Sequence, residues 1–256
     1  MCQVNMCTAS VQGGEFRGIF QDAGSTWLQQ HQKLYGDVLV EIAGRLSGSE
    51  VRRPEILSLW DWDDTLFPTS HMEGMGWVHA AVQEMSHEVA SYFQELDRLI
   101  STILGKAMQH GRVVIVTNAG EGWVQLSSSR YLPRVSALLE WRQVEVVSAR
   151  EKYYRDHPNF PCQWKVRAFS DELYRARDAH IGSVLVMGDS VSDQYAAHRA
   201  VAASGILARN SSLKFVKFAE RPTAAHLIKQ LTIVDSTFDQ IVQHPHSFDV
   251  NVVATS

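Results

Sequence analysis

The chain has 256 residues, of which 45% are hydrophobic and 20% are charged. This length and composition fit one medium globular domain with terminal extensions, and they exclude a fibrous or an intrinsically disordered protein. The formal net charge of −4 and the pI near 6.2 exclude a broad basic field that would attract nucleic acid or an anionic membrane surface.

Signals for export, membrane insertion or disulfide formation are weak. The three cysteines, Cys2, Cys7 and Cys162, are spaced too irregularly for a disulfide framework or a zinc site, which indicates a reducing compartment. The first residues lack a basic start followed by an apolar run, and no stretch reaches about 18 consecutive apolar residues. We therefore expect no membrane span and a cytoplasmic location, with the nucleus as an alternative. Acylation of Cys2 or Cys7 is the less favoured interpretation.

Four parts follow one another along the chain. Residues 1–24 are polar and without periodicity, which predicts a flexible leader. Residues 25–53 carry apolar side chains at loosely helical spacing, which predicts a helical extension. A protein partner could bind through residues 1–53. The main domain is expected over residues 54–234, followed by a polar tail over 235–256.

Within the main domain, short apolar runs alternate with longer amphipathic stretches. This alternation predicts an α/β fold with a Rossmann-like, doubly wound parallel sheet. Strands are expected at 56–60, 112–117, 144–148 and 183–188, with weaker candidates at 205–208 and 213–218. Helices are expected at 82–109, 120–127, 132–141, 165–178, 192–204 and 223–231. Ligands of such folds bind beyond the carboxyl ends of the strands.

Polar residues stand at those carboxyl ends. Asp61, Trp62, Asp63, Asp64 and Thr65 follow the first run, and Lys165 precedes the helix between the third and fourth runs. A single D-x-D-x-T match is weak, because short motifs also arise by chance. The order along the chain of this match and of the polar residues after the other strands is more specific, because one parallel sheet would bring them all together. Those other polar residues are Thr117 with Asn118 and Asp189 with Asp193.

The spacing of Asp61 and Asp63 has a chemical meaning. Side chains two apart in an extended segment point the same way, so both carboxylates can face one pocket. One carboxylate can attack phosphorus, and the other can protonate the leaving oxygen and later deprotonate water. A magnesium ion held by Asp61 and Asp189 would neutralise the nucleophile and the phosphate together. Lys165 would add positive charge, and Thr117 with Asn118 would complete the phosphate-binding set.

DWDDTL, IVTN, Lys165 and MGDSVSD together resemble the four motifs of the haloacid dehalogenase (HAD) superfamily, over about residues 55–220. The resemblance implies a HAD-like hydrolase fold with Asp61 as nucleophile and Asp63 as acid/base. It further implies Thr117 and Lys165 as phosphate binders. The implied magnesium site comprises Asp61, the Asp63 backbone carbonyl, Asp189 and Asp193 as a support. A carboxylate two residues after the nucleophile is typical of the superfamily's phosphatases and phosphotransferases.

Members of this superfamily often carry a cap domain, and this sequence has little room for one. Residues 66–111 are long enough for a flap and one long helix, and residues 119–164 for two short helices, a strand and a loop. The resemblance therefore implies an open site, which acts on a bulky phosphorylated substrate such as a phosphoprotein or is closed by a partner. Phosphotransfer to an acceptor other than water and a non-catalytic binding module on the same fold stay as alternatives. A receiver domain of a signalling relay is disfavoured, because its acidic pair precedes the acceptor on an earlier strand.

Several neighbouring residues have simpler interpretations. Thr65 and Ser190 are expected to cap helices or turns, and Asp64 to orient its loop. Tryptophans beside apolar runs are more often packing residues than substrate platforms. That interpretation is favoured for Trp60, Trp62, Trp123 and Trp164.

Overall fold

A computed structural model describes residues 55–78, 86–177, 179, 181–205 and 211–254. All of them belong to the second of two compact units, Val51–Ser256. The predicted leader (1–24) and almost all of the predicted extension (25–53) belong to the other unit, and both lie outside the described residues. The weak strand candidate at 205–208 also falls almost entirely outside them.

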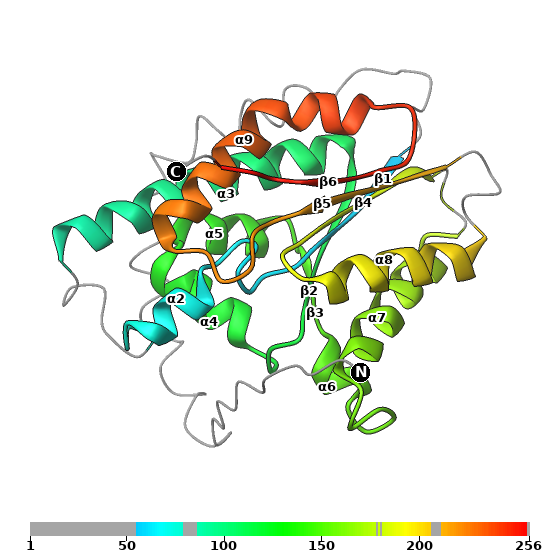
Figure 1. Ribbon diagram of the computed structural model, residues 1–256, viewed down its shortest axis with the longest axis horizontal. Coiled ribbons are helices and arrows are strands. Elements are labelled where there is room, and N and C mark those ends of the chain that lie inside the picture. Colours follow the sequence, from blue (N-terminus) through cyan, green and yellow to red (C-terminus); the bar gives the residue numbers. More distant parts are fainter. Residues whose placement is uncertain (1–54, 79–85, 178, 180, 206–210, 255–256) are drawn as a thin grey trace. The chain divides into compact units, whose positions relative to one another are not determined.

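A six-stranded, all-parallel sheet forms the centre of the described unit (Figure 1). Its strand order is β3-β2-β1-β4-β5-β6. The chain therefore winds outward from β1 to β3, returns to the middle and winds outward again from β4 to β6. This is the Rossmann-like, doubly wound topology. The strands are β1 (Glu55–Trp60), β2 (Gly111–Thr117), β3 (Glu145–Ser148), β4 (Ile181–Gly188), β5 (Ser212–Lys217) and β6 (Phe248–Asn251).

Helices cover both faces of the sheet (Figure 1). One face packs against α3 (His87–His110), α4 (Trp123–Tyr131), α5 (Pro133–Trp141) and α9 (Ala224–Gln243). The other face packs against α6 (Ala149–Tyr153), α7 (Pro161–Arg175) and α8 (Val191–Ser204). The short α2 (Thr69–Gly74) follows the loop after β1. Among the described residues, no helix is long and apolar enough to cross a membrane.

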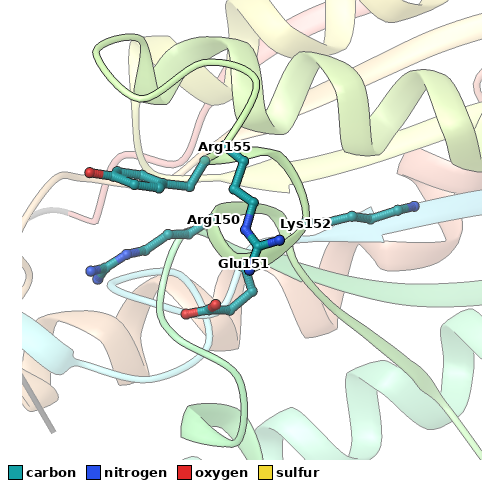
Figure 2. Close-up of a pocket in the computed structure, with 5 residues that line it drawn as sticks. Arg150, Glu151, Lys152 and Arg155 are labelled. Carbon is teal, nitrogen blue, oxygen red and sulfur yellow. The ribbon is translucent and has the colours of Figure 1, made fainter. Parts of the chain in front are cut away.

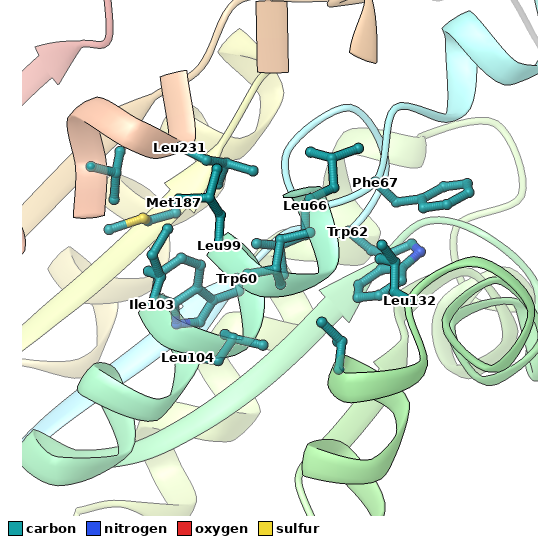
Figure 3. Packing of buried hydrophobic residues seen from close by; sticks show 14 of the residues in the cluster. Trp60, Trp62, Leu66, Phe67, Leu99, Ile103, Leu104, Leu132, Met187 and Leu231 are labelled. Atoms are coloured by element: carbon teal, nitrogen blue, oxygen red, sulfur yellow. The ribbon is translucent and has the colours of Figure 1, made fainter. Parts of the chain in front are cut away.

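Strand β1 shows why the central strands are nearly continuous apolar runs. Leu57 and Leu59 contribute to the core on the α7 and α8 side, while Ile56 and Trp60 contribute to the core on the other side. Trp60 packs there with side chains of α3, α9 and β4, among them Leu99, Ile103, Leu231 and Met187 (Figure 3). Burying one such side chain contributes about 1.5–3 kcal/mol. The residues after β1 therefore follow a rigid strand that is covered by helices on both faces of the sheet.

The prediction of a polar tail over residues 235–256 was wrong. Residues 235–243 continue α9 as far as Gln243, and Phe248–Asn251 form β6, which pairs in parallel with β5. The helix extends because apolar residues such as Val234, Phe238 and Val242 continue to face the core. The edge strand was missed because it has four residues that are half-buried or exposed, so it lacks an apolar run.

Candidate functional site

The strand order places a switch point between β1 and β4, and we call the region beyond the carboxyl ends of these two strands the crevice. Strands β1 and β4 are neighbours, but their chain connections leave in opposite directions, to β2 and to β5. Ligands of doubly wound sheets bind at such a switch point, beyond the carboxyl ends of the strands. Asp61 is the first residue after β1 and Asp189 is the first residue after β4. The backbone N–H of Asp61 donates to the Met187 carbonyl at 2.9 Å, which ties the two strand ends together.

Lys165 links the two sides of this crevice. It lies in the second turn of α7 and is 4% exposed, and its Nζ donates to Asp61 Oδ1 at 2.6 Å. The same Nζ donates to Asp193 Oδ1. Burial by itself lowers the pKa of the Lys165 ammonium, but the Asp193 and Asp61 carboxylates raise it above the usual value. The ammonium is therefore a fixed positive charge.

Asp193 is held by the start of α8. Ser190 is the N-cap of this helix, as expected, and forms a capping box with Asp193. The Asp193 Oδ2 accepts from the Ser190 hydroxyl at 2.7 Å and from the Ser190 N–H at 3.1 Å. A Cβ added to Gly188 would lie 2.7 Å from Asp193 Oδ2, so a residue without a side chain is needed there. Both Asp193 oxygens are thus engaged, which suits a supporting role.

Lys217 holds the Asp189 loop from the other side. This residue ends β5, and its Nζ donates to the backbone carbonyl of Asp189 at 2.6 Å. A second N–H···O bond runs from the Phe218 N–H to the Gly188 carbonyl at 2.9 Å. One oxygen of the Asp189 carboxylate lies within 4.8 Å of oxygens of Asp61 and Asp193. We did not predict Lys217 as part of the site.

Negative charge exceeds positive charge in this crevice. Burial raises the pKa of Asp61 well above its usual value; Lys165 lowers it, and the carboxylates of Asp193 and Asp189 raise it further. Burial and the Asp193 carboxylate raise the pKa of Asp189 to about 7. With Asp61, Asp189 and Asp193 all ionised, the single ammonium of Lys165 leaves an excess of negative charge.

A divalent cation fits this donor set. Carboxylate oxygens are the hard ligands that Mg²⁺ prefers, and the three groups are close enough to share one ion. A cation would also offset the excess negative charge that burial makes costly. The acidic cluster of Asp61, Asp189 and Asp193 is therefore a candidate metal site, and its chemistry does not identify the metal.

Asp63 occupies a different position from Asp61. Its carboxylate accepts hydrogen bonds from Thr69 Oγ1 at 2.6 Å and from Thr117 Oγ1 at 2.7 Å. The indole N–H of Trp123 donates to it at 2.8 Å. These donors come from three elements, α2, β2 and α4, so the direction of the Asp63 side chain is set by tertiary structure. The side chain of Asp63 is not part of the acidic cluster.

A tight turn carries Asp63 and Asp64. The Trp62 carbonyl accepts from the N–H groups of Leu66 and Phe67 at 2.9 and 2.8 Å, and Asp64 adopts a positive φ of 59°. Asp64 orients this loop, as expected, by accepting from the Ser70 N–H at 2.9 Å. Thr65 does not cap a helix: its hydroxyl lies 3.3 Å from Asp61 Oδ2 inside the turn.

Thr117 and Asn118, the two residues at the end of β2, differ in their hydrogen bonding. The Thr117 hydroxyl is bound to Asp63 and accepts from the Ala119 N–H at 2.9 Å. Asn118 Oδ1 is buried, and it has no hydrogen-bond partner within the described residues. An unpaired buried acceptor of this kind would gain from a water or a substrate donor.

No protein-family model, curated protein or solved structure matches this chain. Function therefore has to be inferred from the residues of the site.

The structure brings most of the predicted site residues together at one edge of the sheet. Asp61, Lys165, Asp189 and Asp193 form one cluster, and Asp63 forms a second, linked group with Thr117. Three of the four tryptophans, Trp60, Trp62 and Trp164, are buried packing residues. Sequence reasoning missed Thr69 and the role of Trp123. The position of Trp123 just after the IVTN segment was the available signal.

Proposed function

We propose that this protein is a magnesium-dependent phosphatase of the HAD type, which hydrolyses a phosphomonoester through an aspartyl-phosphate on Asp61. The observation that carries the proposal is the position of Asp61. This carboxylate stands at the switch point of the sheet, 2.6 Å from the Lys165 ammonium and beside Asp189, with Asp63 two residues further on. The capping box of α8 gives Asp193 a structural role, but no such role explains the Asp61 and Asp189 carboxylates beside it.

The two oxygens of Asp61 differ in their surroundings. Oδ1 accepts from Lys165 Nζ at 2.6 Å, whereas the contact of Oδ2 with the Thr65 hydroxyl is longer, at 3.3 Å. We assign the attack on phosphorus to Oδ2, because its lone pairs are less committed. The bond from Oδ2 to phosphorus forms as the bond from phosphorus to the leaving oxygen breaks. Magnesium, when bound by Asp61 and Asp189, supplies positive charge to the phosphate oxygens and lowers their repulsion of the nucleophile.

Asp63 completes the proton transfers. As a carboxylic acid it gives its proton to the leaving oxygen, and the resulting carboxylate takes a proton from the water that attacks the aspartyl-phosphate. That second attack breaks the bond between phosphorus and Asp61 Oδ2 and releases inorganic phosphate. Thr69, Thr117 and Trp123 would hold the Asp63 carboxylate in one direction through both steps.

The strand order also separates this proposal from a receiver domain. Receiver domains have the flavodoxin-like order 2-1-3-4-5, whereas the order here is β3-β2-β1-β4-β5-β6.

A cap domain would lie between β1 and β2 or between β2 and β4. Over the described residues, these two segments form β3 and helices that cover the sheet. An open site for a bulky phosphorylated substrate is consistent with that arrangement.

Hydrolysis of an aryl phosphate as a function of magnesium tests the proposal. We expect activity that chelation abolishes and added Mg²⁺ restores, because the acidic cluster would otherwise repel the phosphate. Asp189→Asn should raise the Mg²⁺ concentration for half-maximal activity by about tenfold or more. Asp239→Asn removes an exposed carboxylate of α9 and should leave that concentration unchanged. Full activity of the dialysed protein in excess chelator would contradict the proposal.

A further inference from the structure

A pocket of about 330 Å³ opens beside α6, outside the crevice described above. Arg150, Glu151, Lys152, Tyr154 and Arg155 line it, as Figure 2 shows. Three of these side chains are cationic and one is a carboxylate, so the pocket is basic although the whole chain is acidic. We call this set of five residues the basic pocket.

Two of its cations are not neutralised by neighbours. Within the described part of the chain, Arg150 and Arg155 form no ion pair, and both are exposed. Lys152, in contrast, lies 2.8 Å from the Asp171 carboxylate. An arginine presents five N–H donors in a planar fork that matches a carboxylate or a phosphate. The basic pocket therefore has two guanidinium groups available for an anionic ligand.

The basic pocket lies at the same edge of the sheet as Asp63. Helix α6 starts directly after β3, and the hydroxyl of Ser148 at that junction donates to the Ala119 carbonyl at 2.6 Å. The Ala119 N–H in turn donates to Thr117 Oγ1, which donates to Asp63. One loop, residues 117–120, thus separates the basic pocket from the carboxylate that we propose as acid/base.

The surface around the basic pocket suits a peptide better than a small metabolite. Tyr154, which lines the pocket beside Arg155, is 49% exposed. Exposed aromatic side chains next to arginines are typical of surfaces that bind proteins. The carboxylate of Glu151 interrupts the positive charge, which disfavours a continuous polyanion such as nucleic acid.

We propose that the basic pocket binds a second anionic group of a phosphorylated protein substrate, carried by a residue that flanks the phosphorylated one. The inference rests on the proposed phosphatase function, since it assigns a substrate class to the same site. The anionic group is a side-chain carboxylate or a second phosphate, because Arg150 and Arg155 recognise both. Such a contact would select acidic phosphopeptides from among phosphomonoesters.

Phosphopeptide hydrolysis by the full chain tests this inference. The peptides share one phosphoserine and carry alanine, acidic or second phosphoserine residues at the flanking positions. We expect the wild-type kcat/KM to be about tenfold higher for peptides with added negative charge, from two screened ion pairs. In the Arg150→Ala/Arg155→Ala variant that ratio should fall to about one. Comparison of the acidic and the doubly phosphorylated peptides identifies which anion the pocket favours.

Arg199→Ala is the matched control, because it removes an exposed positive charge from α8. This control should retain the full preference for acidic peptides. Equal hydrolysis of neutral and acidic peptides by the wild-type protein, with an aryl phosphate still cleaved, would overturn the inference and leave the phosphatase proposal standing. If no phosphomonoester is cleaved, the phosphatase proposal fails. In that case, fluorescence polarisation measures how tightly labelled peptides bind to the protein. Equal affinity for neutral and acidic peptides, with no change in the Arg150→Ala/Arg155→Ala variant, would overturn the inference.

Discussion

The two ends of the parallel sheet both concentrate charge, but they do so in different ways. At the amino ends of β2 and β3, Arg112 bridges Glu145 and Glu172 at 2.6 Å each, and Arg175 lies 2.9 Å from Glu172. Two guanidinium groups thus meet two carboxylates. At the carboxyl ends, the single ammonium of Lys165 meets the three carboxylates of the acidic cluster.

This difference separates a structural network from a candidate site. The amino-end network is balanced, and its arginines neutralise Glu172, whose side chain is fully buried. Burial of charge is tolerated when each group is paired. The carboxyl-end cluster has three carboxylates for one ammonium, so its full ionisation leaves an excess of negative charge that a bound cation would offset. In this molecule, a cluster with an excess of one charge is therefore a better indicator of a functional site than a cluster whose charges are balanced.

The largest effect is expected at the nucleophile. Asp61→Asn keeps the size of the side chain and its contact region but removes the attacking oxygen anion, so turnover should fall by about a thousandfold or more. Changing the leaving group should not restore it. Steady-state hydrolysis of aryl and alkyl phosphates measures the effect, with Asp239→Asn as the control. Retention of more than a tenth of the activity would contradict the assignment.

Removing one cation from each end of the sheet compares how much each charge cluster contributes to the free energy of unfolding. Lys165→Met leaves buried carboxylates without their partner, which should lower the free energy of unfolding by about 3 kcal/mol. Arg175→Met should cost about 1 kcal/mol or less, because Arg175 is 47% exposed and Arg112 still pairs with Glu172. Urea denaturation measures both. Equal losses would mean that the two ends are not energetically different.

A smaller effect is expected at Asp63. Asp63→Asn removes the proton donor and the later base, which should lower steady-state turnover of an activated aryl phosphate by about a hundredfold. Formation of the aspartyl-phosphate should continue, because a phenol leaves without protonation. Stopped-flow traces should show a burst of phenol followed by a slow phase. A uniform loss for all leaving groups, without a burst, would exclude the acid/base role.

The last effect, which is spread over about two pH units, concerns a buried carboxylate outside both ends. Asp97 of α3 accepts from the N–H groups of Arg134 and Val135 at 3.0 and 2.9 Å, and burial raises its pKa from 3.8 to about 6. Because the folded state binds the proton more tightly, this stabilising contribution is complete below pH 3.8 and is lost as the pH rises through 6.

Urea denaturation over this pH range checks the sign. In the wild-type protein, Asp97 should contribute a slope of at most about −1.4 kcal/mol per pH unit to the free energy of unfolding. Asp97→Asn should remove that contribution, so the difference between the two curves isolates one group. A difference that does not change between pH 4 and 6 would contradict the raised pKa.

The sequence predicted the parts of the fold that depend on local pattern. Five strands and the longer helices follow from apolar runs and amphipathic stretches, whereas the short helices α2 and α6 were not predicted. Asp61 and Asp189 stand where strand ends must meet. Edge strand β6 was not predicted, because an exposed strand of four residues has no apolar signal. The contacts of Asp63 with Thr69 and Trp123 could not be predicted either, since they depend on how α2 and α4 pack around the turn.

The covalent state of Asp61 during turnover tests the central proposal most directly. Protein quenched in acid during hydrolysis of a labelled aryl phosphate can be reduced with borohydride, which converts an acyl phosphate of aspartate to homoserine. Peptide mass spectrometry then locates the change. We expect homoserine at position 61, in larger amount in the Asp63→Asn variant and absent without magnesium. Sustained hydrolysis with Asp61 unmodified, or with the label on another residue, would contradict the account.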